Sequence, residues 1–151
     1  MSILIRDAEP KDANQMGVVM VSAFFSAFLG PVAAEYLDLS WSPETSAAAW
    51  RRYFESERSP GEFLLVATSD NSSINLVVGL AMGRRNLDHE GYKHRLASLQ
   101  VLPSHHRQGI GRKLVAAAAI RFQREGDSGL IIGCAKENPN CAFYRALGGV
   151  E

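Results

Sequence analysis

Two glycines near the start of a predicted helix, Gly109 and Gly111, have the spacing of an anion-binding site. They follow a strand-like stretch, residues 96–102, which ends at Pro103 because proline cannot donate the next ladder hydrogen bond. The apolar residues from there on are four apart, which predicts one face of a helix: Ile110, Leu114, Ala118 and Phe122. Backbone N–H groups in the first turn of a helix have no intrahelical partner. Without side chains at the glycines an anion can reach these groups, so the segment predicts a phosphate or pyrophosphate site.

This segment resembles the Gcn5-related N-acetyltransferase (GNAT) family, whose motif is Arg/Gln-x-x-Gly-x-Gly/Ala after a strand that ends near Val-x-Pro. Here the motif reads H-R-Q-G-I-G, residues 106–111, with His106 at its first position. A second segment, ENPNCAFYRALGG at 137–149, resembles the family's N-P-x-x-x-F-Y-x-x-L-G-G. A Gly-x-Gly alone often marks only a tight turn or close packing, but both motifs occur here in the family's order and spacing.

The resemblance implies that the chain holds acetyl-CoA. Main-chain groups of Leu99, Gln100 and Val101 would hydrogen-bond the pantetheine arm, as a strand accepts an added strand. The pyrophosphate would lie against the residues of the glycine motif: Arg107, Gln108, Gly109, Ile110, Gly111 and Arg112. The two arginines of this set can add charge-assisted hydrogen bonds, or they are solvated charges at a helix end. Asn138 is a cofactor ligand, as in the family, or the N-cap of the last helix, or both.

Tyr144 is the candidate catalytic residue, because it aligns with the tyrosine that the family commonly uses to protonate the leaving thiolate. A phenol has a pKa of about 10 and a thiol about 8.5, so a neutral phenol can donate the proton. The alternative is a tyrosine packed against the core. No spacing singles out a general base: Asp88, Glu90 and His94 all lie near the third strand-like segment, and any of them could relay a proton through water.

The histidines and cysteines do not predict a metal site. His105 and His106 are neighbours in a loop, which rarely presents two ligands convergently, so we interpret them as a solvated pair. The spacing of Cys134 and Cys141 suggests neither zinc binding nor a disulfide scaffold. Cys141 is either a reactive thiol at a helix start or, as we favour, a small buried hydrophobe.

The helices and strands that must position these residues can be predicted from the spacing of apolar residues and from the residues typical of turns and helix ends. Strands are predicted at Ile3–Ile5 and at 62–68, 74–84, 93–102 and 130–135, with the second and third forming a hairpin. Helices are predicted from about Pro10 to Gly30, from Ser42 as N-cap to before Ser59, at 108–124 and at 139–147. This β-α-α-β-β-β-α-β-α order is that of the GNAT fold. We expect a single domain over residues 1–151, an α/β fold of α+β type, with three layers and a mixed, mostly antiparallel sheet between helices.

The sequence stops at Glu151, where family members usually continue into one or two further strands. We expect these C-terminal strands to be missing, either in a truncated product or in a naturally short member. Because residues 130–135 are almost wholly apolar, we expect that strand to be central in the sheet. An unpaired strand edge invites association, so we also expect a homodimer or larger assembly.

Composition is that of a globular protein, with 46% hydrophobic and 21% charged residues. Basic and acidic residues balance at 16 each, so no overall basic field recruits nucleic acid. No apolar stretch is long enough for a membrane span, and residues 1–7 lack the features of a signal peptide. Two cysteines fit a reducing setting, by default cytoplasmic or nuclear.

We therefore expect an acetyl-CoA-dependent N-acetyltransferase that acts by direct ternary-complex transfer to a primary amine of a small molecule or peptide, without a metal. Residues 26–45, including Phe28, Tyr36, Asp38 and Trp41, are the expected place for the acceptor. The alternative is a non-catalytic acyl-CoA-binding or sensing module. A generic nucleotide-phosphate binder is disfavoured, because the chain contains no Gly-x-x-x-x-Gly-Lys-Ser/Thr sequence.

Overall fold

The computed structural model describes residues 2–70, 74–87, 91–134, 136 and 138–150. Its strands and α-helices follow one another in the predicted order: β1 (Ile3–Asp7), α1 (Ala13–Phe28), α2 (Pro43–Glu55), β2 (Phe63–Ser69), β3 (Leu76–Arg85), β4 (His94–Val101), α3 (Ile110–Arg124), β5 (Ile131–Ile132) and α4 (Cys141–Ala146). No helix within the described residues is long and apolar enough to cross a lipid bilayer.

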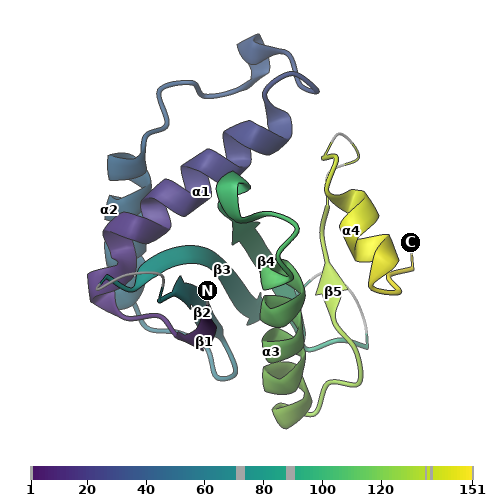
Figure 1. The fold of residues 1–151 in the computed structure, drawn as a ribbon. Helices are drawn as coiled ribbons and strands as arrows, with labels where there is room; N and C mark the ends of the chain where they lie inside the picture. The colour runs from purple at the N-terminus through teal and green to yellow at the C-terminus, as the bar shows by residue number, and fades with distance from the viewer. Residues whose placement is uncertain (1, 71–73, 88–90, 135, 137, 151) are drawn as a thin grey trace.

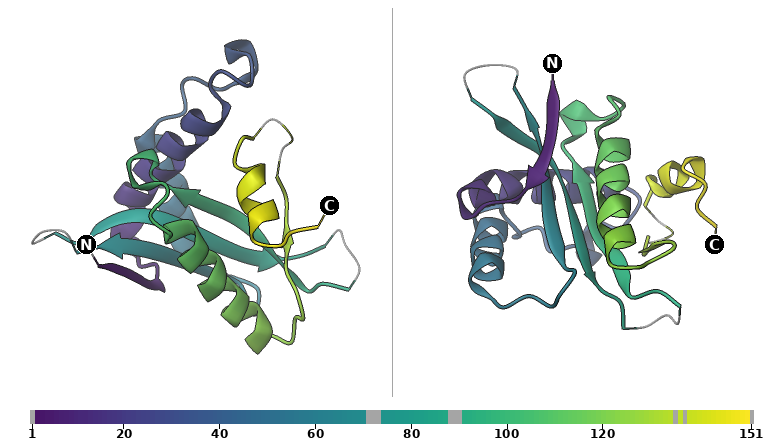
Figure 2. Two further views of the ribbon diagram at one scale, coloured as in Figure 1. Left: turned by 45° about the vertical axis from the view of Figure 1, so that its right-hand side comes forward. Right: turned by 90° about the horizontal axis from the view of Figure 1, so that it is seen from below.

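The strands form one sheet in the order β1-β2-β3-β4-β5. The first four pair antiparallel with their neighbours, and β5 pairs parallel with β4. Helices α1 and α2 cover one face of the sheet, and α3 and α4 lie on the other (Figures 1 and 2). The expected three-layer fold with a mixed, mostly antiparallel sheet is confirmed.

The core follows from the alternation of side chains along the central strands. All seven residues of β2 are buried. Leu64 and Val66 pack in the cluster that contains Met16 and Val19 of α1, whereas Leu65 packs on the opposite face in the cluster of α3. On α3 the buried residues are the four that the spacing predicts: Ile110, Leu114, Ala118 and Phe122. Burying each of the larger side chains contributes about 1.5–3 kcal/mol, which holds α3 firmly on the sheet.

A glycine lets α2 approach α1 closely. A Cβ at Gly17 would lie 2.3 Å from the carbonyl oxygen of Pro43 and 2.9 Å from the backbone nitrogen of Ala47. The residue that weakens α1 by local propensity therefore allows its contact with α2. The predicted N-cap is confirmed, since Ser42 Oγ accepts a hydrogen bond from the Thr45 N–H at 3.1 Å.

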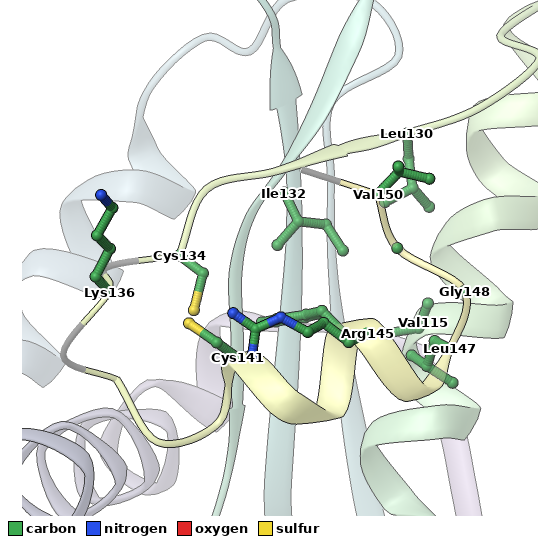
Figure 3. A pocket seen from close by; sticks show the side chains of 12 residues that line it. Val115, Leu130, Ile132, Cys134, Lys136, Cys141, Arg145, Leu147, Gly148 and Val150 are labelled. Carbon is green, nitrogen blue, oxygen red and sulfur yellow. The ribbon is translucent and has the colours of Figure 1, made fainter.

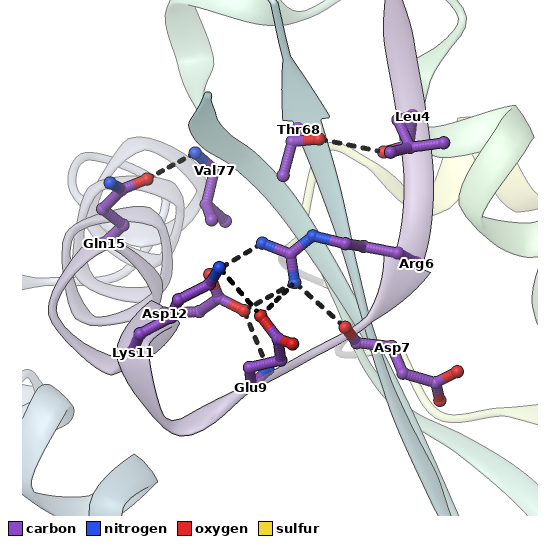
Figure 4. A network of polar contacts seen from close by, with 9 residues as sticks. All are labelled: Leu4, Arg6, Asp7, Glu9, Lys11, Asp12, Gln15, Thr68 and Val77. Atoms are coloured by element: carbon purple, nitrogen blue, oxygen red, sulfur yellow. Dashed lines mark hydrogen bonds and ion pairs between the residues drawn. The ribbon is translucent and has the colours of Figure 1, made fainter. Parts of the chain in front are cut away.

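An ion pair fixes the corner between β1 and α1 (Figure 4). The Arg6 guanidinium donates two hydrogen bonds to the Asp12 carboxylate, at 2.8 and 2.9 Å, and the Glu9 N–H donates a third at 2.8 Å. Asp12 is buried, with 4% of its surface exposed. Burial alone would raise the pKa of Asp12, but the hydrogen bonds from Arg6 and Glu9 outweigh it and lower that pKa.

The expectation of a central strand at 130–135 is wrong. Strand β5 consists of Ile131 and Ile132 alone, and it lies at the edge of the sheet. The apolar residues around it have another role, because Leu130 and Ile132 pack against the cluster that includes α3. Burial of one face under helices therefore explains an apolar run that resembles a central strand.

Candidate active site

Strands β4 and β5 part soon after they meet. They pair only at Arg95↔Ile131 and Leu96↔Ile132 within the described residues. Farther along β4, Leu99 to Val101 pair with β3 on one side and with no described residue of β5 on the other. The C-terminal half of β4 therefore presents one open edge next to the beginning of α3 (Figure 1).

Alternation decides which peptide groups point to that open edge. The Leu102 N–H donates a hydrogen bond to the carbonyl of Val78 in β3 at 2.8 Å, so the peptide groups of Leu102 point toward β3. Successive residues of a strand turn their peptide groups to opposite sides. Gln100 therefore also faces β3, whereas Leu99 and Val101 direct their N–H and C=O groups away from it.

The loop between β4 and α3 has two residues with a left-handed backbone. Gly109, the N-cap of α3, has φ +78°, and Arg107 has φ +61°. A non-glycine residue in this region costs about 1–2 kcal/mol, so the fold holds Arg107 there against its preference. His106 helps to fix the loop, because its Nε2 lies 2.9 Å from the Val101 carbonyl oxygen, at hydrogen-bond distance.

The two glycines of the motif are needed for different structural reasons. A Cβ at Gly109 would meet nothing within 4 Å, so this position borders open space and requires glycine for its backbone angle. A Cβ at Gly111 would lie 3.2 Å from Cζ of Phe143, because the Phe143 ring packs over this position. The absent side chain at Gly111 thus makes room for Phe143 of α4.

A cavity of about 590 Å³ lies between α3, β5 and α4 (Figure 3). Tyr144 is one of the residues that line it. The described residues that line it are Val115, Leu130, Ile132, Cys134, Lys136, Cys141, Tyr144, Arg145, Leu147, Gly148, Gly149 and Val150. Burial, followed by the nearby thiols of Cys134 and Cys141, raises the pKa of Tyr144 to about 12. The phenol is therefore neutral, and able to donate a proton, throughout the ordinary pH range.

Asn138 organises the approach to α4. Its Oδ1 accepts a hydrogen bond from the Asn140 N–H at 2.9 Å, and its carbonyl oxygen accepts one from the Cys141 N–H at 3.2 Å. The N-cap of α4 is Asn140 and not Asn138, which corrects the N-cap interpretation. Asn138 instead closes the turn that leads into the helix.

The candidate site therefore has two parts. Tyr144 lines the cavity, while Leu99, Val101 and the glycine-motif residues do not line it and lie along β4 and at the start of α3. The Phe143 ring on Gly111 joins the two, and it stands edge to face with Tyr144 at 5.3 Å between ring centroids. Sequence analysis missed this contact, although Phe143 belongs to the second motif.

Of the three candidates for a general base, the structure describes His94 but not Asp88 or Glu90. His94 lies outside the candidate site: its Nδ1 is 2.9 Å from Asp127 Oδ2, both residues are buried, and the ring stacks on Phe122. Phe122 is twelve residues after Ile110, about 18 Å along α3 from the glycine motif. Asp88 and Glu90 lie outside the described residues.

An aromatic cluster occupies the segment expected for the acceptor. Phe24 contacts both Phe28 and Trp41, with ring centroids 5.0 and 5.3 Å apart. Tyr36 is 77% exposed, and Asp38 accepts a hydrogen bond from the Ser40 N–H at 3.0 Å. Among the expected residues, Phe28 and Trp41 therefore form a packed surface, whereas Tyr36 is available to a ligand.

The adjacent histidines have separate partners in the structure. His105 Nδ1 lies 2.8 Å from Ser104 Oγ, whereas His106 Nε2 lies next to the Val101 carbonyl oxygen. The first pair is local, while the second ties the loop back to β4. His106 is exposed, as the sequence predicts, and its ring also ties the loop to β4.

Comparison with known sequences agrees with this geometry. The sequence profile of the acetyltransferase (GNAT) family matches residues 31–148. The chain is 27% identical over 145 residues to the uncharacterized N-acetyltransferase YuaI of Bacillus subtilis (strain 168), which covers 95% of this chain and 78% of that protein.

The fold is similar to those of solved acetyltransferases. The PaiA N-acetyltransferase from Thermoplasma acidophilum, in complex with coenzyme A, aligns with a TM-score of 0.73 at 18% identity, over 99% of this chain and 89% of that chain. AAC(6′)-Iy, in complex with the bisubstrate analogue CoA-S-monomethyl-acetylneamine, aligns with a TM-score of 0.69 at 17% identity, over 100% of this chain and 92% of that chain. At these identities the likeness concerns the fold.

Proposed function

The chain belongs to the acetyltransferase (GNAT) family, and on that premise we propose that it transfers the acetyl group of acetyl-CoA to a primary amine. Acetyl-CoA, when bound, supplies the acetyl thioester and a thiol leaving group. The amine belongs to a small molecule or a peptide, and transfer takes place directly within a ternary complex. No residue of this chain needs to carry the acetyl group.

The residues present fit such a cofactor. The open edge of β4 offers the peptide groups of Leu99 and the N–H group of Val101 to the pantetheine arm, as an added strand would require, while His106 bonds to the Val101 carbonyl. The first turn of α3 offers N–H groups next to the open space at Gly109, where the helix dipole also favours a pyrophosphate. Arg107 and Arg112 are both exposed and supply positive charge there.

Tyr144 would act as the acid. Its phenolic oxygen holds a proton in the cavity wall, and the raised pKa of Tyr144 keeps that proton in place until negative charge develops on the departing sulfur. Proton donation from the Tyr144 hydroxyl neutralises the leaving group. Asn138 supports this arrangement by closing the turn before α4.

We propose that the acceptor binds near the 26–45 segment, in which Tyr36 is exposed and Phe28 and Trp41 both pack on Phe24. The bisubstrate analogue bound by AAC(6′)-Iy joins coenzyme A to an aminoglycoside fragment, which supports a small-molecule amine as the first class to test.

The observation that supports the proposal most directly is the contact between the two motifs, in which the Phe143 ring packs on Gly111. The test is a panel of primary amines incubated with acetyl-CoA, with CoA release followed by chromatography and the acetylated product by mass. Acetylation of at least one amine, well above the no-enzyme rate, is expected. Tight binding of acetyl-CoA with no transfer to any amine of a broad panel would instead favour the acyl-CoA-binding module.

A further inference from the structure

Two cysteine thiols meet in the wall of the cavity that contains Tyr144. Cys134 follows β5 by two residues, and Cys141 is the first residue of α4. Both residues line the cavity, and their sulfur atoms point toward one another (Figure 3). Neither cysteine is in a disulfide in the structure, so both are thiols.

We propose that Cys134 and Cys141 form a site of reversible oxidation, where a peroxide converts the two thiols into an intramolecular disulfide. Three features support this site. The thiols face one another, both are partly exposed to an open cavity, and the turn closed by Asn138 fixes Cys141 relative to the approaching chain. A disulfide between them requires that the two Cβ atoms approach to about 3.5–4.5 Å.

We propose different roles for the two sulfur atoms in this oxidation. Burial, followed by the hydrogen bond and charge of Cys141, raises the pKa of Cys134 to about 11, so Cys134 keeps its proton near neutral pH. We assign the first oxidation to Cys141, which lies at the start of α4 in the wall of the cavity. Its sulfur attacks hydrogen peroxide, an S–O bond forms as the O–O bond breaks, and hydroxide leaves and is protonated to water.

The second step uses Cys134 as the resolving thiol. Its sulfur attacks the sulfenic acid on Cys141, the S–S bond forms, the S–O bond breaks, and the thiol proton leaves with the oxygen in a second water. The two cysteines lose two electrons and two protons in total, and the peroxide gains both. Excess thiol, such as dithiothreitol, reverses the bridge by thiol–disulfide exchange.

The consequence for activity rests on the proposed function. A disulfide is about 2.05 Å long, shorter than any hydrogen-bonded pair of sulfurs, so bridging draws the first turn of α4 toward β5. Tyr144 is one helical turn after Cys141 and moves with it, while the start of α3 is not part of the bridge. A displacement of about 1 Å at a reacting group can cost on the order of 10²-fold in rate. We expect oxidation to lower turnover about 10–100-fold and to change acetyl-CoA affinity less than about threefold.

The test compares the wild-type chain with Cys134→Ser and Cys141→Ser after treatment with hydrogen peroxide and removal of the excess by catalase. A loss of about 2 Da and a cross-linked 134–141 peptide are expected in the wild type alone, reversed by dithiothreitol. In Cys134→Ser we expect a sulfenic acid on Cys141, which dimedone traps. Wild-type protein that keeps both thiols, or that is oxidised at each cysteine separately, would overturn the proposed site.

Turnover of the oxidised and re-reduced wild type separates this site from the proposed function. A reversible drop in turnover that is absent from Cys134→Ser supports the link to Tyr144, and a bridged enzyme with unchanged turnover would contradict that link. If the bridge forms in a chain that acetylates no amine in either state, the proposed function fails while the oxidation site stands.

Discussion

At the scale of single residues, a variant of Tyr144 should affect turnover without affecting the binding of acetyl-CoA. Tyr144→Phe removes one oxygen and leaves the ring that packs beside Phe143. We expect turnover to fall about 10²–10⁴-fold, the usual contribution of a positioned acid. Acetyl-CoA affinity by calorimetry should change by less than about threefold, because the proposed main-chain contacts lie on β4 and α3. Unchanged turnover in a folded variant would make Tyr144 a packing residue.

The same residue predicts a pH profile. The acceptor amine must lose its proton before it attacks, so the rate should rise with pH toward the amine's pKa, about 10.4 for a lysine-like amine. Because the pKa of Tyr144 is raised to about 12, its phenol stays protonated and should cause no fall in rate up to pH ~10. Wild-type and Tyr144→Phe profiles should therefore have the same shape. An alkaline fall between pH 8 and pH 10 in the wild type alone would contradict the raised pKa.

At the scale of elements, the Arg6–Asp12 pair joins β1 to α1. Asp12→Asn keeps the size of the side chain and removes the charge that Arg6 and the Glu9 N–H stabilise. Breaking a fully buried pair costs about 3–5 kcal/mol, and since the Arg6 side chain is 26% exposed we expect about 2–3 kcal/mol at neutral pH. Urea unfolding measures this difference.

The pH dependence of that difference has a definite sign. The pKa of Asp12 is lower in the folded chain than in the unfolded one, so its contribution is fully present above the unfolded value of about 3.9. It disappears as the pH falls from there through the folded value. Wild type and Asp12→Asn should therefore converge in stability at low pH, and a difference that stays constant down to pH ~2 would contradict the ion pair.

Element boundaries and buried faces could be predicted from the sequence where the signal is local. The four-residue spacing from Ile110 to Phe122 and the cap at Ser42 are such signals, and the structure confirms both. Contacts between distant segments leave no such pattern. The packing of Phe143 on Gly111 depends on how α4 is placed after β5, and periodicity contains no information about that placement.

The error at β5 and the unpredicted contact of His106 have related causes. An apolar run at 130–135 is compatible with a central strand or with one face buried under helices, and only the tertiary structure separates the two. The side chain of His106 bonds to a carbonyl five residues earlier, so its role depends on the shape of the loop. The site residues proposed from the family resemblance remain proposals, since main-chain contacts leave almost no side-chain signature.

At the scale of the whole molecule, the edge at β5 predicts association. Within the described residues no strand pairs with the outer side of β5, and such an edge can accept a strand from a second copy. We expect light scattering to give twice the mass of one chain. Gly133 is exposed, and a Cβ there would meet nothing within 4 Å, so Gly133→Lys adds a charge at this edge without a clash. This variant should be monomeric with a nearly unchanged melting temperature.

A wild-type chain that is monomeric over a wide concentration range would contradict this association. Full acetylating activity in that monomer would further show that one chain suffices for the site. A dimer that Gly133→Lys leaves intact would place the interface elsewhere on the molecule.

The central claim is that acetyl-CoA binds at the start of α3, and calorimetric titration of Gly109→Val against the matched variant His106→Gln tests it most directly. Valine would extend into the open space at φ +78°, and we expect at least about 30-fold weaker binding, roughly 2 kcal/mol. Glutamine at 106 can still donate to the Val101 carbonyl, so its affinity should stay within about threefold of the wild type. Gly109→Asn, which tolerates the left-handed backbone, repeats the test if the valine variant does not fold. Unchanged acetyl-CoA affinity in a folded Gly109→Val or Gly109→Asn chain would contradict the site.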